Sequence, residues 1–99
     1  MNITPTCIKA LYKIPNATIK DDVNMMGLYE EDDKYAQEDL DLFFAKYAPN
    51  VPQDTHPVLA SIDGGTAPVS PDSELNGGES DIDMDLSFSL IYVSFSVKV

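Results

Sequence analysis

Residues 76–85 read NGGESDIDMD and place four acidic side chains next to an apolar segment, with no basic residue among them. The acids are Glu79, Asp81, Asp83 and Asp85. Carboxylates are seldom buried without a partner, so their position beside core-forming residues needs a physical reason. We predict that a helix from Glu79 to about Ile91 carries all four of them.

The four acids of this predicted helix fall on two sides of it. At about 100° per residue, one narrow apolar stripe forms. Its members are Ile82, Leu86 and Leu90. Glu79 and Asp83, four residues apart, share that stripe and are expected to face the core. Asp81 and Asp85 are expected to point away from it.

The pair Glu79 and Asp83 has two interpretations. In the structural one, Glu79 complements the positive end of the helix dipole and Asp83 lies at the edge of the apolar stripe. In the functional one, the two carboxyl groups are held so close that one keeps a proton while the other acts as a base. A carboxylate base works best near its own pKa, so such a site would operate at acid pH.

Other candidate sites have less support. Residues 81–85 supply three acids at the spacing of an EF-hand calcium loop, but Leu86 and Tyr92 stand where that loop needs Gly and Glu. His56, the only histidine, could belong to a Ser-His-Asp site or pair with Cys7, although a loop histidine is the simpler interpretation. The sequence contains no GxGxxG, P-loop or zinc-ligand cluster.

The composition indicates one acidic, globular domain. The chain has 99 residues, a net charge of −11 and 43% hydrophobic residues, so a core is expected. All six basic residues are Lys, which argues against nucleic acid and anionic membrane as partners. The excess of acidic residues is consistent either with a role in solubility or with a protein that functions at low pH. No apolar run approaches the roughly 18 residues of a membrane span, and the N-terminus has no signal-peptide pattern.

The order of the predicted elements favours an α/β domain. Helices are predicted at about 5–13, 37–47 and 79–91, and strands at 25–29, within 56–65 and from Val93 to Val99. Alternating helices and strands indicate a parallel sheet covered by helices. The last strand would leave an edge that can pair with another chain.

Three blocks of the sequence occur in the order and spacing of one enzyme family. They are TPTCIKALYKIPNAT at 4–18, the run from GLYEEDDKYAQ to LASIDGG at 27–65, and NGGESDIDMDL at 76–86. Together they resemble the sedolisin family, the serine-carboxyl peptidases, and especially its secreted fungal tripeptidyl-peptidases. The resemblance implies that residues 1–99 are the N-terminal part of a subtilisin-like catalytic domain, a truncated three-layer α/β fold with a partial parallel sheet flanked by helices.

The resemblance also implies a catalytic site of the Ser-Glu-Asp type. By the family's E-x-x-x-D motif, Glu79 resembles the general base and Asp83 the residue that orients it. The nucleophilic serine, the oxyanion-hole Asp and a calcium site of the full-length family member belong to downstream regions, and no SGTS-like stretch occurs here. The parent would cleave peptides or proteins, whereas this chain alone is expected to be inactive, with no cofactor of its own.

Further expectations follow from the same resemblance. The protein would be extracellular, with weak support from sequons at Asn2 and Asn16. Cys7 resembles a family cysteine whose disulfide partner lies just upstream of Met1. Asp85 stands where glutamine is more usual. The alternative is a catalytically inactive acidic interaction module or a degenerate gene fragment.

Overall fold

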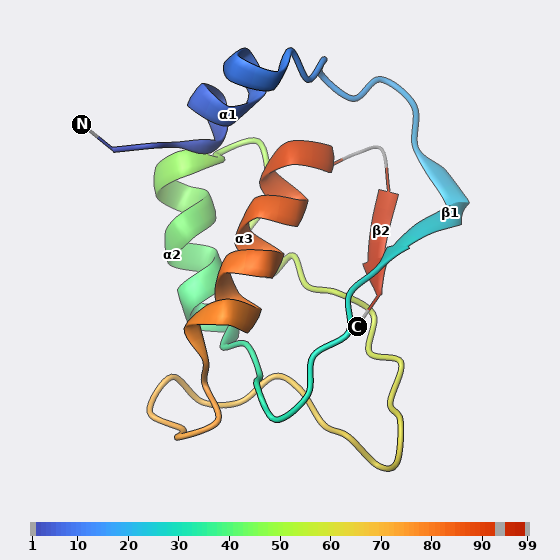
Figure 1. Cartoon of the computed structure of the whole chain (residues 1–99), viewed down its shortest axis with the longest axis vertical. Helices are drawn as coiled ribbons and strands as arrows, with labels where there is room; N and C mark the ends of the chain where they lie inside the picture. Colours follow the sequence, from blue (N-terminus) through green and yellow to red (C-terminus); the bar gives the residue numbers. More distant parts are fainter. Residues whose placement is uncertain (1, 93–94, 99) are drawn as a thin grey trace.

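The computed structural model describes residues 2–92 and 95–98, with backbone alone at residue 22 and at 95–98 (Figure 1). The elements are α1 (Pro5–Tyr12), β1 (Asp21–Gly27), α2 (Gln37–Tyr47), α3 (Gly78–Ile91) and β2 (Phe95–Lys98). Helices α2 and α3 lie side by side, α1 crosses one end of this pair, and β1 and β2 lie on the far side of α3 from α2 (Figure 1). None of the helices in these described ranges is long and apolar enough to cross a membrane.

Helix α2 follows its apolar periodicity. Leu40 and Phe44 are fully buried one turn apart, Phe43 and Tyr47 are partly buried, and Leu42 on the opposite side is 71% exposed. Glu38 and Asp39 lie in its first turn, where negative charge interacts favourably with the positive end of the helix dipole. The chain then turns at Ala48, which is followed by a proline.

The hydrophobic core lies between α2 and α3. Phe44 and Phe88 meet edge to face, with ring centroids 6.0 Å apart and planes at 77°. Leu40 and Met84 are completely buried beside them. The remaining buried apolar residues flank α2 and are Tyr35, Ala36, Ala48 and Val51. This single cluster holds the two helices together.

The sheet of the described residues is small. β1 and β2 pair in parallel, from Asp21 opposite Phe95 to Gly27 opposite Lys98, with an irregular register between them. The predicted strand at 25–29 is found slightly earlier, as β1. Part of the predicted C-terminal strand is found as β2, while residues 93, 94 and 99 lie outside the described residues. The larger helix-covered sheet that the resemblance implies stays a prediction.

The prediction of a strand within residues 56–65 is wrong. This segment is a loop with only an isolated bridge at Val58. Val58, Leu59 and Ile62, whose apolar character suggested a buried strand, are 53%, 44% and 70% exposed. Pro57 removes one backbone donor, and a short apolar run does not by itself distinguish a strand from other structure. The predicted helices at 5–13, 37–47 and 79–91 are all confirmed to within a residue.

The predicted orientation of α3 is also wrong. Its buried face is Ser80, Met84 and Phe88, whereas Ile82 is 52% exposed. Apolar residues occur on nearly all sides of this helix, so two stripes at four-residue spacing compete for the core. The stripe that packs against Leu40 and Phe44 of α2 is the one with the flexible Met84 and the large aromatic Phe88.

Substitutions in α3 distinguish the two stripes. Met84→Ala should lower the free energy of unfolding by about 2–5 kcal/mol, because it leaves a cavity against α2. Ile82→Ala removes the same number of heavy atoms from the exposed side and should cost less than about 1 kcal/mol. Urea unfolding followed by circular dichroism measures both. Equal losses in the two variants would show that the buried face is assigned incorrectly.

Candidate functional site

The first turns of α2 and α3 are capped by residues from outside their own helices. The N-cap residues, Ala36 and Gly77, make no side-chain cap hydrogen bond in the described structure. Instead, the Ala36 backbone N–H donates to Asp81 Oδ1 at 3.1 Å, and the Ser80 backbone N–H donates to Asp33 Oδ2 at 3.0 Å. The two helices therefore start side by side. Asp81 of α3 caps the start of α2, and Asp33, which precedes α2, caps the start of α3.

Backbone hydrogen bonds reinforce this junction. The Lys34 N–H donates to the Leu75 carbonyl at 2.9 Å, and the Gly77 N–H donates to the Lys34 carbonyl at 3.0 Å, as in a parallel bridge. These bonds bring the loop at residues 30–34 against the first turns of α3. The carboxylates that follow β1 consequently meet those of α3, although about fifty residues separate them in sequence.

A cluster of three carboxylates results on one side of α3. Glu79 is exposed in the first turn, Asp83 is half-buried one turn later, and Glu30 approaches from the loop after β1. Burial, together with hydrogen bonding to Asp83, raises the pKa of Glu30 to about 7, and the charges of Asp33 and Glu79 add to this rise. Glu30 Oε1 is buried with no hydrogen-bond partner among the described residues. Below about pH 7 Glu30 therefore holds a proton next to Asp83.

The structure brings Glu79 and Asp83 together on one helix face, but this face differs from the expected one. The expectation that both acids are aimed at the core is wrong, because α3 is rotated so that Ser80, Met84 and Phe88 face α2. The side chain that neighbours Asp83 is Glu30. The E-x-x-x-D pair thus faces the loop after β1, with Glu79 open to solvent.

The other two acids of the stretch lie on the α2 side, where the sequence did not predict them. Burial raises the pKa of Asp85 to about 7, with smaller contributions from the charges of Asp81 and Asp39. Burial also raises the pKa of Asp81, although its hydrogen bond from Ala36 acts in the opposite direction. Asp85 Oδ1 is buried without a partner within the described residues. This interface therefore favours a protonated Asp85.

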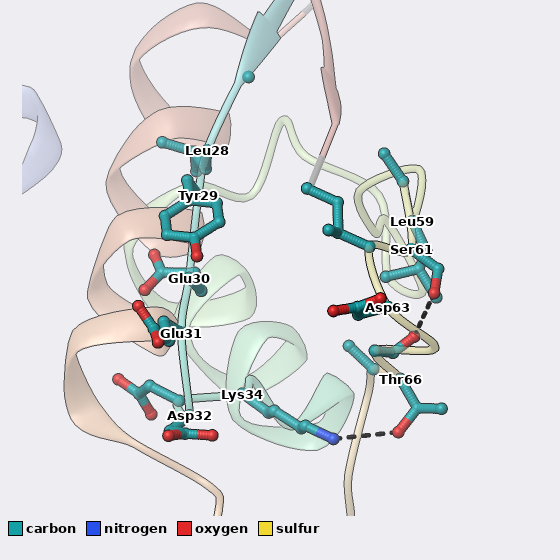
Figure 2. Close-up of a pocket in the computed structure, with 16 residues that line it drawn as sticks. Leu28, Tyr29, Glu30, Glu31, Asp32, Lys34, Leu59, Ser61, Asp63 and Thr66 are labelled. Atoms are coloured by element: carbon teal, nitrogen blue, oxygen red, sulfur yellow. Dashed lines mark hydrogen bonds between the residues drawn. The ribbon is translucent and has the colours of Figure 1, made fainter.

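A pocket of about 710 Å³ lies beside the three-carboxylate cluster. One wall is residues 27–34 and the other is residues 59–63 and 65–67. Figure 2 shows the two walls, with Lys34 Nζ donating to Thr66 Oγ1 at 3.0 Å across one end of the pocket. Glu30 belongs to the first wall, whereas Glu79 and Asp83 are not among the residues that line the pocket. The second wall combines the exposed apolar side chains of Leu59 and Ile62 with polar ones, namely Ser61, Asp63 and Thr66.

The sequence EEDDK at residues 30–34 indicates a solvated loop. Sequence reasoning therefore missed Glu30 and Asp33 as members of the site. That interpretation holds for Glu31 and Asp32, which are exposed, but Glu30 and Asp33 are half-buried. One signal could have found Glu30. It follows a strand within three residues, and in α/β folds functional side chains collect beyond the carboxyl ends of strands. No local signal marks Asp33, since its partner Ser80 is 47 residues away.

The weaker candidate sites do not assemble in the structure. His56 is exposed, with Nδ1 2.8 Å from the Asp54 carbonyl in its own loop. Cys7 is an exposed free thiol whose pKa is lowered by hydrogen bonds with Thr4. The three acids of the EF-hand spacing lie inside a helix and not in a loop. Among the described residues no three His, Cys, Asp or Glu side chains are arranged to hold a metal ion.

Relatives of known description match most of the chain. It is 52% identical over 91 residues to aorsin of Aspergillus oryzae and 43% identical over 96 residues to tripeptidyl-peptidase sed1 of Aspergillus fumigatus. It is 34% identical over 91 residues to tripeptidyl-peptidase SED1 of Arthroderma otae. These matches cover 91–96% of the chain but 13–15% of each relative, so the chain spans about one seventh of their length. No family model and no solved structure matches significantly.

The raised pKa of the half-buried Asp85 is expected to make stability depend on pH. Its folded-state pKa of about 7 exceeds the ordinary 3.8, so between these values the folded chain keeps a proton that the unfolded chain releases. The free energy of unfolding should therefore fall as pH rises through this window, and Asp85→Asn should make the fall smaller. Unfolding at pH 4 and pH 7.5 tests this, with exposed Asp72→Asn as the matched control. An unchanged pH dependence in Asp85→Asn would rule out Asp85 as the responsible group.

Proposed function

Because this chain is related to the fungal tripeptidyl-peptidases of the sedolisin family along about nine-tenths of its length, we propose that it is a segment of an acid-acting serine-carboxyl peptidase. In this proposal Glu79 is the general base and Asp83 is the residue that orients it. A serine supplied from outside this chain is the nucleophile, since no SGTS-like stretch is present in it. Peptides or proteins are the proposed substrates, and an extracellular location is proposed with them.

The observation that supports the proposal most is the arrangement of Glu79, Asp83 and Glu30. The exposed Glu79 carboxylate is accessible to an incoming hydroxyl group, while the half-buried Asp83 lies one turn behind it. A general base must reach the proton that it removes, and a second group must hold it in place. In the proposal the two acids of the E-x-x-x-D motif meet these needs from one helix face.

Glu30 gives this site a reason to work at acid pH. While Glu30 is protonated it can donate a hydrogen bond to Asp83, which keeps Asp83 as an acceptor with a fixed orientation. As pH approaches about 7, Glu30 ionises and places a further negative charge beside Asp83 and Glu79. Electrostatic repulsion then disturbs the cluster. In the proposed mechanism Glu79 removes the serine proton during attack on the peptide carbonyl and later donates it to the leaving amine.

The calcium ion that the resemblance implies has no place in this part of the mechanism. The described residues contain no group of three potential ligands at suitable positions, so they do not fit the ion. No step proposed here involves a metal.

An interaction module is the second candidate function. Val23 on β1 is 92% exposed, and β1 and β2 are both edge strands in the two-stranded sheet of the described residues. Such edges pair readily with other strands, so association with another polypeptide is the proposed alternative. If this alternative holds, the 99-residue chain should form concentration-dependent oligomers in size-exclusion chromatography, whereas a compact monomer at all concentrations would count against it.

Catalysis by Glu79 is tested in a chimera. The matching segment of the Aspergillus fumigatus tripeptidyl-peptidase sed1 would be replaced by this chain, which is 43% identical to it. Glu79→Gln should lower kcat by about 10²–10⁴-fold with little change in KM, because a general base is lost. Peptide hydrolysis at pH 4 is the assay.

Two controls accompany the chimera. Glu74→Gln makes the same chemical change at an exposed position ahead of α3 and should leave kcat unchanged. The isolated 99-residue chain should hydrolyse nothing. If Glu79→Gln retained the parent kcat in an active chimera, Glu79 would not be the base.

A further inference from the structure

We propose that Asp33 is a positioning residue of this site, supplying from the loop before α2 the N-terminal cap that α3 lacks and thereby holding the turn from which Glu79 projects. The inference rests on the proposed role of Glu79, and it assigns a function to a residue that no family motif marks. Asp33 itself does not contact the reacting atoms. Its effect is transmitted through the backbone of the first turn of α3.

The cap contact occupies the position that an ordinary N-cap side chain serves. Such a side chain accepts a hydrogen bond from the N–H of the second or third helical residue. In α3 the N-cap is Gly77, which has no side chain, and the third helical residue is Ser80. Asp33 Oδ2 accepts from the Ser80 N–H at 3.0 Å, and Ser80 Oγ donates to the Asp33 carbonyl at 3.4 Å. Ser80 is 1% exposed, so water could not replace this acceptor.

The contact between Asp33 and the start of α3 requires that residue 77 have no side chain. A Cβ built on Gly77 would overlap the carboxyl group of Asp33. The φ angle of Gly77 is −110°, which any residue can adopt, so backbone conformation does not require glycine there. The absent side chain leaves the space that the Asp33 carboxylate fills. Gly77 and Asp33 therefore act as a complementary pair.

The position of Glu79 follows from this pair. Glu79 lies between Gly77 and Ser80, within the turn whose N–H groups have no partner inside the helix. Without the cap that turn would fray, whereas Asp83, one turn further on, has helical hydrogen bonds on both sides. Loss of the cap should therefore move Glu79 relative to Asp83. Misplacing one catalytic group in this way lowers kcat more than substrate affinity.

Asp33 also carries a charge near Glu30, so the test must separate its charge from its cap. Asparagine caps helices as well as aspartate but is neutral, which makes Asp33→Asn the conservative variant. Asp33→Ala removes both properties. The double variant Asp33→Ala with Gly77→Ser provides a local cap, because the serine hydroxyl can occupy the space that the carboxylate leaves. Asp32→Ala is the matched control, because it makes the same change at the exposed neighbouring residue.

The first measurement is amide hydrogen exchange by NMR on the 99-residue chain. Asp33→Ala should speed exchange at Ser80 about fivefold, the fold-change that corresponds to the loss of one typical N-cap. Asp33→Asn, the double variant and Asp32→Ala should all match the parent at this amide. Equal exchange in Asp33→Ala and the parent would overturn the proposed cap. If Asp33→Asn exchanged as fast as Asp33→Ala, charge would be responsible and the proposal would also fail.

The second measurement is kinetic and uses the same set of variants in the sed1 chimera. Asp33→Ala should lower kcat about tenfold or more with KM nearly unchanged, and both Asp33→Asn and the double variant should restore it. Full activity in Asp33→Ala, combined with inactive Glu79→Gln, would overturn the positioning role and leave the proposed function intact. Full activity in Glu79→Gln would refute the proposed function, whereas the exchange data would still decide whether Asp33 is the cap.

Discussion

The reciprocal capping of α2 and α3 determines the arrangement of the rest of this molecule. Two helices that start at the same end place two positive dipole ends next to each other, which is unfavourable unless negative charge lies between them. Asp33 and Asp81 supply that charge and satisfy backbone N–H groups that neither N-cap residue can serve. Once the starts are joined, Leu40 and Phe44 meet Met84 and Phe88, which completes the core. The loop after β1 is drawn against α3 by the same junction.

The density of carboxylates beside the core has several separate causes. Asp81 caps α2, Asp85 is half-buried on the α2 side, and Glu79 and Asp83 face Glu30 on the other side of α3. Protonation reduces the negative charge at two positions, because the pKa values of Glu30 and Asp85 are both raised to about 7. Raised pKa values on both sides of α3 make acid pH the condition under which the helix carries least repulsion. Conditions that favour the fold and those proposed for the chemistry therefore coincide.

The sequence was sufficient to predict the helices and one helix face, and its failures have physical causes. In α2 the apolar residues occupy one stripe, so Leu40 and Phe44 could be assigned to the core. In α3 they occur all round, and the choice between Ile82 and Met84 was made by α2, which a helical wheel does not include. Periodicity likewise could not show that Glu30 and Asp33 are partly buried, because the residues that they contact belong to α3. Long-range hydrogen bonds of this kind have no local pattern.

The candidate site survived the wrong rotation of α3 for a geometric reason. Residues four apart share a helix face whichever way the helix is turned, so Glu79 and Asp83 were bound to lie together once the helix formed. Rotation decides only what that face meets. In this molecule the face meets Glu30 from the loop after β1, while Glu79 stays exposed to solvent and Asp83 is half-buried. A pair aimed at the core would have been isolated from any substrate, so the observed rotation suits the proposed role of Glu79 as a base better than the expected rotation does.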